Sequence, residues 1–177
     1  MTQAIVLLRG VNVGGHRKLP MADLKRALAE LGYGDVQTLL ASGNVVVDAG
    51  TTTPAALEKK LEADLQRALG LQTDVMVRDP IQWSAIIAAN PFVNEAKADP
   101  SHLLMVALKE PPSSSARAAI EAWPGPELIH VGDREAFVFY GDGMRDSKLN
   151  LSKLGTGTGR NWNTVLKLQA LVRPRSP

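Results

Sequence analysis

Three loops rich in Gly and Asn carry the side chains whose types and spacing suit ligand binding. The first runs from Arg9 to Gly15, the second is Ser42-Gly43-Asn44, and the third runs from Gly155 to Thr164. Each combines glycine backbone with amide, hydroxyl or guanidinium groups, and none contains a carboxylate. Such a set binds anions well and abstracts protons poorly. The loops therefore predict an anion site, and they identify no catalytic residue.

The first loop joins a predicted strand to a predicted helix. Such a turn can present backbone N–H groups to a phosphate, helped by the helix dipole. Gly10 and Gly15 have the spacing of a Walker A loop, but His16 and Arg17 stand where that motif requires Lys and Ser or Thr. The alternative interpretation is a structural turn whose glycines adopt positive φ.

The other two loops also have structural alternatives. Ser42-Gly43-Asn44 is too short for a nucleophile elbow, and a tight turn explains its Gly and Asn. In the third loop a flexible Gly/Thr run precedes a helix, for which Asn161 or Asn163 is the N-cap. Arg160 would then lie beside the positive helix end and could bind an anion in bidentate fashion. Trp162 either stacks on a base or, as is commoner, anchors the helix in the core.

Few charged groups outside these loops suggest chemistry. Lys148 and Ser152 are four residues apart, so a short helix over 146–154 would bring them together, and we interpret Lys148 as an anion-binding cation rather than a solvated lysine. The three histidines are scattered and have no partner at metal-binding spacing, so no metal site is expected. Glu58 and Glu62 share a helix face with lysines beside them, which indicates a solvated surface.

Composition limits the class of protein. The chain has 177 residues, 45% of them hydrophobic, which suffices for a core, and it has no cysteine for disulfides, thiolate metal sites or a Cys nucleophile. With no signal peptide or membrane span recognisable, we expect a cytoplasmic protein. Residues 143–177 carry a charge of +6 and the rest −4, which sum to the net +2. This asymmetry favours phosphate, nucleotide or nucleic acid as partner, with a solvated basic tail as the alternative.

Hydrophobic periodicity predicts an α+β fold. In the first half, strands and helices follow in the order β-α-β-β-α-β, the ferredoxin-like pattern, over residues 4–9, 19–31, 36–40, 45–47, 54–69 and 75–77. Thr53 is expected to cap the helix that starts at Pro54. A short helix over 79–89 and a linker over 90–100 follow.

The second half repeats part of this pattern. The order β-α-β-β-α is predicted over residues 103–108, 113–123, 128–131, 136–140 and 163–172. We therefore expect two ferredoxin-like units with antiparallel sheets and helices on one face: residues 1–92 with an extra C-terminal helix, and residues 93–177 as an incomplete unit with a basic C-terminal helix. The strand over 136–140 matches only part of an RNA-recognition motif, and the first unit lacks an aromatic platform, so standard RNA binding of this type is not favoured.

At these motifs the chain resembles the bacterial family called domain of unknown function 1697. The similar segments, in the family's order and spread over nearly the whole chain, are Leu7–Gly15, Leu19–Leu24, Ala41–Val46, Ser147–Leu149 and Arg160–Val165. The resemblance implies two ferredoxin-like units, and it implies no reaction or cofactor. One departure is the Gly-Thr-Gly run before Arg160, where the family is less rich in glycine.

We therefore expect a cytoplasmic protein, monomeric or homodimeric, that binds a phosphorylated small molecule or nucleotide. One alternative is an enzyme acting on that ligand, with Lys148 or Ser42 as the reactive group; another is nucleic-acid binding through the basic C-terminal segment. No cofactor is assigned. The candidate ligand-binding residues are Arg9, Gly10, Asn12, Gly14, Gly15, Ser42, Gly43, Asn44, Lys148, Arg160, Asn161, Trp162, Asn163 and Thr164.

Overall fold

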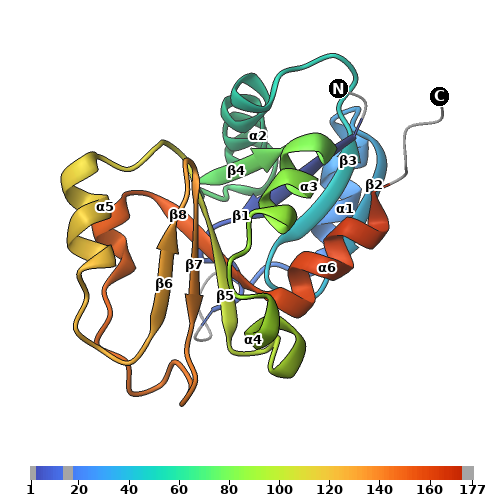
Figure 1. The fold of residues 1–177 in the computed structure, drawn as a ribbon. Coiled ribbons are helices and arrows are strands. Elements are labelled where there is room, and N and C mark those ends of the chain that lie inside the picture. Colours follow the sequence, from blue (N-terminus) through green and yellow to red (C-terminus); the bar gives the residue numbers. More distant parts are fainter. Residues whose placement is uncertain (1–2, 14–17, 173–177) are drawn as a thin grey trace. The chain divides into compact units, whose positions relative to one another are not determined.

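A computed structural model describes residues 3–13 and 18–172 (Figure 1). The chain divides into two compact units, of which unit 1 comprises Met1–Ser84 and Lys167–Pro177, and unit 2 comprises Ala85–Leu166. Each unit contains one four-stranded antiparallel sheet with helices, which confirms the predicted α+β class of two ferredoxin-like units. The boundary at residues 92 and 93 stays a prediction.

Unit 1 has the predicted β-α-β-β-α-β order. Its elements are β1 (Gln3–Leu8), α1 (Met21–Glu30), β2 (Gly34–Leu39), β3 (Asn44–Asp48), α2 (Pro54–Leu69) and β4 (Val75–Arg78), and α3 (Pro80–Ala88) follows. The sheet order is β2-β3-β1-β4, and every neighbouring pair is antiparallel.

The core of unit 1 is formed by one face of the sheet and the apolar faces of α1 and α2. Alternate residues of β1, such as Ala4, Val6 and Leu8, belong to the same buried cluster as the leucines of α1 and α2, because strand side chains repeat every two residues and helix side chains every 3.6. The α2 boundaries are those predicted: Thr53 accepts a hydrogen bond from the Ala56 N–H at 3.4 Å, and Gly70 ends the helix with φ of 62°. Helices on one face of the sheet are thereby confirmed.

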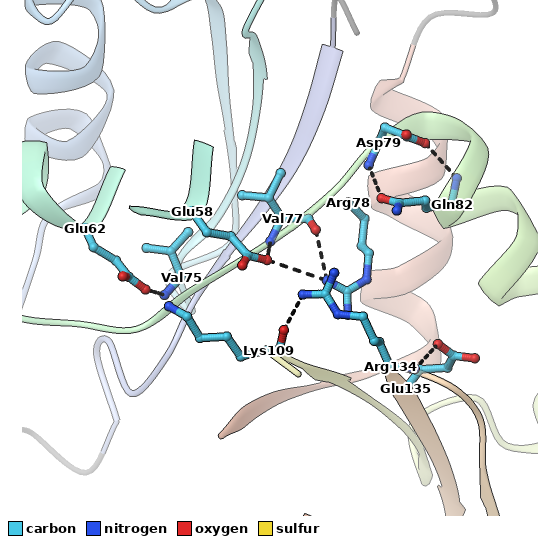
Figure 2. A network of polar contacts seen from close by, with 10 residues as sticks. All are labelled: Glu58, Glu62, Val75, Val77, Arg78, Asp79, Gln82, Lys109, Arg134 and Glu135. Carbon is cyan, nitrogen blue, oxygen red and sulfur yellow. Dashed lines mark hydrogen bonds and ion pairs between the residues drawn. The ribbon is translucent and has the colours of Figure 1, made fainter. Parts of the chain in front are cut away.

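The edge strand β4 is covered by side chains of α2 (Figure 2). The Val77 N–H donates to Glu58 Oε1 and the Val75 N–H donates to Glu62 Oε1, each at 2.9 Å. The two acceptors are four residues apart on the helix and the two donors are two apart on the strand, so the spacings match. Arg78 Nη1 lies 3.8 Å from the same Glu58 oxygen and donates to the Val77 carbonyl. An edge strand covered in this way presents fewer unpaired backbone groups to other chains.

The prediction that Glu58 and Glu62 form a solvated face was wrong. Glu58 is only 3% exposed. Periodicity places both carboxylates on one helix face, but only the fold places that face over a strand edge. A buried carboxylate then persists because it accepts a hydrogen bond and lies near a guanidinium.

Unit 2 repeats the sheet order of unit 1. Its elements are α4 (Val93–Ala98), β5 (Leu103–Leu108), α5 (Ser114–Glu121), β6 (Leu128–Val131), β7 (Glu135–Phe139), η1 (Leu151–Leu154), β8 (Gly157–Asn161) and the first part of α6 (Trp162–Leu171). The strand order β6-β7-β5-β8 corresponds to β2-β3-β1-β4. Side chains of α5 also cover the edge strand β6, since the Val131 N–H donates to Glu121 Oε1 at 3.3 Å and Arg117 donates to the Val131 carbonyl.

Several predictions for unit 2 need correction, and the first two concern the segments over 155–161 and 90–100. The Gly/Thr run expected to be a flexible loop forms β8, so the sheet has the fourth strand that the sequence analysis missed. Its glycines permit close strand approach: a Cβ at Gly157 or Gly159 would lie 2.9 Å from atoms of β5. The segment over 90–100, predicted as a linker, contains α4.

Among the helices of residues 3–13 and 18–172, none has the length and apolar character needed to cross a membrane.

The edge contacts of α2 predict unequal costs of truncation. Glu58→Ala removes the acceptor of a buried N–H and a carboxylate near Arg78, so we expect it to lower the free energy of unfolding by about 3–5 kcal/mol. Glu62→Ala, at a partly exposed position, is the matched control with an expected cost of about 1–2 kcal/mol. Urea denaturation measures both, and equal costs would contradict the role given to Glu58.

Candidate functional site

The first two loops meet in unit 1. The Leu8 N–H donates to the Gly43 carbonyl at 2.8 Å, and Asn12 Nδ2 donates to the carbonyls of Ala41 at 2.6 Å and Leu19 at 2.8 Å. The Leu19 N–H returns a hydrogen bond of 2.7 Å to Asn12 Oδ1. The side-chain amide of Asn12 thus joins the two loops, and these hydrogen bonds occupy both its oxygen and its nitrogen. The backbone of Asn12 has a positive φ of 56°.

The polar groups of the second loop also act within the turn. Asn44 is fully buried, and its Nδ2 donates to the Leu39 carbonyl at 2.8 Å and to Ser42 Oγ at 2.9 Å. Gly43 has a φ of 76°, and a Cβ there would lie 2.8 Å from the Leu8 Cβ. Both the backbone conformation and the lack of space require glycine.

Arg9 and Gly10 line an open groove of about 1000 Å³ in unit 1. Arg9 Nη1 forms an ion pair of 3.1 Å with Asp74 Oδ2, and Glu62 also lines the groove. The remaining lining residues are Gln66, Gln72 and Thr73. Two carboxylates against one guanidinium do not favour an anion here. Gly14 and Gly15, like His16 and Arg17, lie outside the described residues.

The third loop belongs to unit 2, where β8 carries Arg160 into the interior. Arg160 is 7% exposed, and its Nη1 donates to Thr158 Oγ1 and to the Gly159 carbonyl, both at 2.8 Å. Burial lowers the pKa of Arg160 to about 10, so the guanidinium is still charged at neutral pH. The sequence analysis expected Arg160 beside a helix end; it lies on the strand before that helix, and these buried contacts suit a structural role.

The start of α6 resolves two alternatives. Asn161 Oδ1 accepts hydrogen bonds from the N–H and the hydroxyl of Thr164, both at 3.0 Å, so Asn161 rather than Asn163 is the cap. Trp162 is 5% exposed, and its ring meets Phe137 edge-on with centroids 6.3 Å apart. Trp162 therefore anchors the helix, which was the commoner interpretation. Asn163 is exposed.

Lys148 is exposed at a second cavity, of about 400 Å³, in unit 2. The predicted helix over 146–154 was wrong in extent, because only the 3₁₀ turn η1, from Leu151 to Leu154, is helical. Lys148 therefore does not share a helix face with Ser152. Aromatic and acidic side chains dominate the cavity, namely Trp123, Tyr140, Glu127, Asp142 and Asp146.

Glu127 is held in place within this cavity. Ser147 Oγ donates to Glu127 Oε1, and Trp123 Nε1 donates to Glu127 Oε2 at 2.6 Å. These hydrogen bonds lower the pKa of Glu127, so it stays ionised to lower pH than an ordinary glutamate. Burial, with the nearby charge of Glu127, raises the pKa of Tyr140. At neutral pH the cavity thus contains a fixed carboxylate and a neutral phenol.

A third cavity, of about 410 Å³, was missed by the sequence analysis apart from its glycine loop. It is lined by Lys109, Lys153, the residue Ser113 before α5 and Ala116 within it, and Gly155 and Thr156 of the third loop. The Lys109 N–H donates to the Thr156 carbonyl at 2.8 Å, which joins the β5 end to this loop. Its ionisable lining groups are two lysines and Glu110, which sum to a formal +1.

Part of this cavity was recognisable in the sequence. The helix start is marked by Pro112 and by the cap Ser113, whose Oγ accepts from the Ala116 N–H at 3.1 Å. The two lysines, however, are 44 residues apart (153 − 109). Only the pairing of β5 with β8 brings them to one cavity. Among the residues the structure describes, no group of three or more His, Asp or Glu side chains could hold a metal ion.

Comparison with known proteins shows the family and the fold. The chain belongs to the family described as "Protein of unknown function (DUF1697)", whose model matches residues 1–137. The structure is similar to that of a conserved bacterial protein from Streptococcus pneumoniae, with a TM-score of 0.76 and 21% sequence identity over 96% of this chain and 97% of the other. No curated protein matches the sequence. The motifs around Lys148 and Arg160 lie beyond the family match.

The junction of the first two loops predicts a steric cost at Gly43. Gly43→Ala forces an alanine into positive φ, which lowers the stability of the fold by about 1–2 kcal/mol. The added Cβ also clashes with Leu8, which lowers it by a further amount of about 1–3 kcal/mol. Gly50→Ala is the control, because Gly50 has a φ of 58° and nothing within 4 Å of its added Cβ. We expect Gly43→Ala to cost clearly more in thermal unfolding, and equal melting temperatures would contradict the close packing.

The Ser147 hydrogen bond predicts a pKa change. Ser147→Ala removes a donor that favours the charged form of Glu127, so the pKa of Glu127 should rise toward its usual range. Because the folded pKa of Glu127 is depressed, the stability from this contact is present above the unfolded pKa and is lost as pH falls through the folded pKa. A carboxyl-carbon NMR titration measures the change, with Ser101→Ala as control; an unchanged Glu127 pKa would contradict the assignment.

Proposed function

We propose that this member of the family is a cytoplasmic protein that binds a phosphorylated small molecule or nucleotide. The observation that carries the proposal is the cavity lined by Lys109, Lys153 and the start of α5. It is the one of the three described cavities whose ionisable lining groups sum to a positive charge.

The chemistry of this cavity suits a phosphate. The first backbone N–H groups of a helix have no partner within the helix, and the helix dipole adds partial positive charge there. Ser113, the N-cap residue of α5, and Ala116 in its first turn both line the cavity, so the start of this helix lies at it. Two lysine ammonium groups supply full charges at the same cavity. The volume of about 410 Å³ lies within the range of small-molecule sites.

The cations expected from the sequence support an anion site less well. Arg9 is paired with Asp74, Arg160 is buried against Thr158, and Lys148 lies among carboxylates. We therefore place the phosphate beside Gly155 and Thr156 of the third loop. The glycine loop still contributes, because its backbone pairs with Lys109 and forms one wall.

Binding without turnover is favoured over catalysis at this cavity. Its lining contains no histidine, and its one carboxylate is Glu110. A general base must lie within hydrogen-bond reach of the proton it removes. Among the lining residues, Glu110 alone has a carboxylate that could take this role. Lys148 and Ser42, the reactive groups of the enzyme alternative, do not line this cavity.

The lysines predict the size of the binding defect. Each charge-assisted contact contributes about 1.5–3 kcal/mol, so the Lys109→Gln, Lys153→Gln double variant should weaken binding of AMP or glucose 6-phosphate by about 100-fold or more. The control is Lys97→Gln with Lys167→Gln, which removes the same charge from two exposed lysines outside the cavity. Isothermal titration calorimetry compares the two proteins after circular dichroism has shown that both are folded.

The ligand panel separates this proposal from its alternatives. A thermal-shift screen with inorganic phosphate, AMP, ATP, glucose 6-phosphate and a short oligonucleotide at two salt concentrations is expected to give a salt-tolerant hit on a small phosphate. At about 100 times the dissociation constant such a ligand adds about 2.7 kcal/mol of stability. Hits on the oligonucleotide alone that vanish with salt would support nucleic-acid binding instead. Equal affinity in the double variant and its control would overturn the site assignment.

A further inference from the structure

We propose that the cavity lined by Trp123 and Tyr140 is a second binding site, which takes a compact organic ammonium such as a trimethylammonium group. This cavity of about 400 Å³ lies wholly in unit 2 and shares no lining residue with the phosphate cavity. The proposal does not rest on the phosphate site.

The two aromatic side chains provide faces that attract cations. The negative face of an aromatic ring attracts an ammonium, most strongly for Trp and Tyr, and such rings are the usual walls of sites for quaternary ammonium groups. Trp123 is partly exposed, so a ligand can reach it, and its orientation is fixed because its Nε1 donates to Glu127 at 2.6 Å. Gly125 also lines the cavity, and a Cβ there would collide with both Trp123 and Glu127.

Tyr140 gives the cavity a second aromatic wall with a polar tip. The residue is 5% exposed and lines the cavity. Its hydroxyl is not one of the buried side-chain atoms without a hydrogen bond, so in the free protein it either reaches solvent or has a partner. A ligand hydroxyl near the ammonium group would take the place of water there.

The charge of the cavity selects a cation over an anion. Glu127, Asp142 and Asp146 against Lys148 give a formal charge of −2. Glu127 keeps its charge because Ser147 and Trp123 both donate to it. Asp142, Asp146 and Lys148 are all exposed, so water screens their charges alike, and the fixed Glu127 carboxylate is the least screened of the four. An ammonium over the face of the Trp123 ring would gain cation–π attraction, and the Glu127 carboxylate, which is bonded to the edge of that ring, would add its negative charge nearby.

Choline and 3,3-dimethylbutan-1-ol form a matched pair of probes, because they have the same shape and hydroxyl but only choline is charged. We expect choline to bind at least about ten times more tightly than the neutral alcohol, as cation–π and carboxylate attraction together require. Titration followed by NMR of the Trp123 indole N–H measures both affinities. Equal affinities, or no saturable binding of choline, would overturn the proposal.

Variants then locate the site. Trp123→Leu and Glu127→Gln should each weaken choline binding about tenfold. Tyr140→Phe, which removes only the hydroxyl, should weaken choline binding while leaving tetramethylammonium binding unchanged. Asp133→Asn, at an exposed carboxylate outside the cavity, is the charge-matched control and should bind as the wild type does. If Trp123→Leu fails to fold, Tyr140→Phe and Glu127→Gln still decide. Normal choline binding in both would refute the site.

The double variant at the proposed phosphate cavity distinguishes the two sites. The Lys109→Gln, Lys153→Gln protein should bind choline as the wild type does, since neither lysine lines this cavity. Loss of choline binding in that folded protein would overturn the placement of the ammonium at Trp123.

Discussion

Each sheet of this protein has an edge strand whose outward backbone groups bond to side chains four residues apart on a covering helix. In unit 1 the pair is Glu58 and Glu62 of α2 over β4, and in unit 2 it is Arg117 and Glu121 of α5 over β6. A sheet edge without such partners is a template for pairing with other chains. In unit 1 the two side chains bond to strand residues two apart, and in unit 2 both bond to Val131, so in each unit the contacts hold the helix over the edge strand. The contacts at Val131 thus help to hold α5, whose start lies at the cavity lined by Lys109 and Lys153.

The close approach of β8 to β5 is the second constraint. Gly157 and Gly159 stand where any Cβ would meet β5. Once β8 is paired, Gly155 and Thr156 are held against Lys109, and α6 begins directly after Asn161. A glycine run that suggests flexibility in isolation is therefore an ordered strand, since glycine also permits tight backbone contact.

The charge around a lysine in the folded protein differs from the net charge of the sequence segment that contains it. Residues 143–177 are strongly basic. Lys148 from that segment nevertheless lines a cavity with Glu127, Asp142 and Asp146, whereas Lys153, five residues later, lines one with Lys109. One short segment thus contributes to an acidic, aromatic cavity and to a basic one. The net charge of the segment predicts the charge of neither cavity by itself.

The sequence by itself determined the α+β class, most of the helices and strands, and the cap of α2. These features depend on periodicity and on neighbouring residues, as the unbroken apolar run of β1 and the start of α2 at Pro54 illustrate. It also singled out the turn residues Asn12 and Gly43, although their bonding partners were not predictable. Only the tertiary structure showed that Glu58 is buried, that the third loop is a strand, and that Lys109 and Lys153 share a cavity. The physical reason is that burial and local field depend on which distant segments pair, and that pairing is set by packing over the whole sheet.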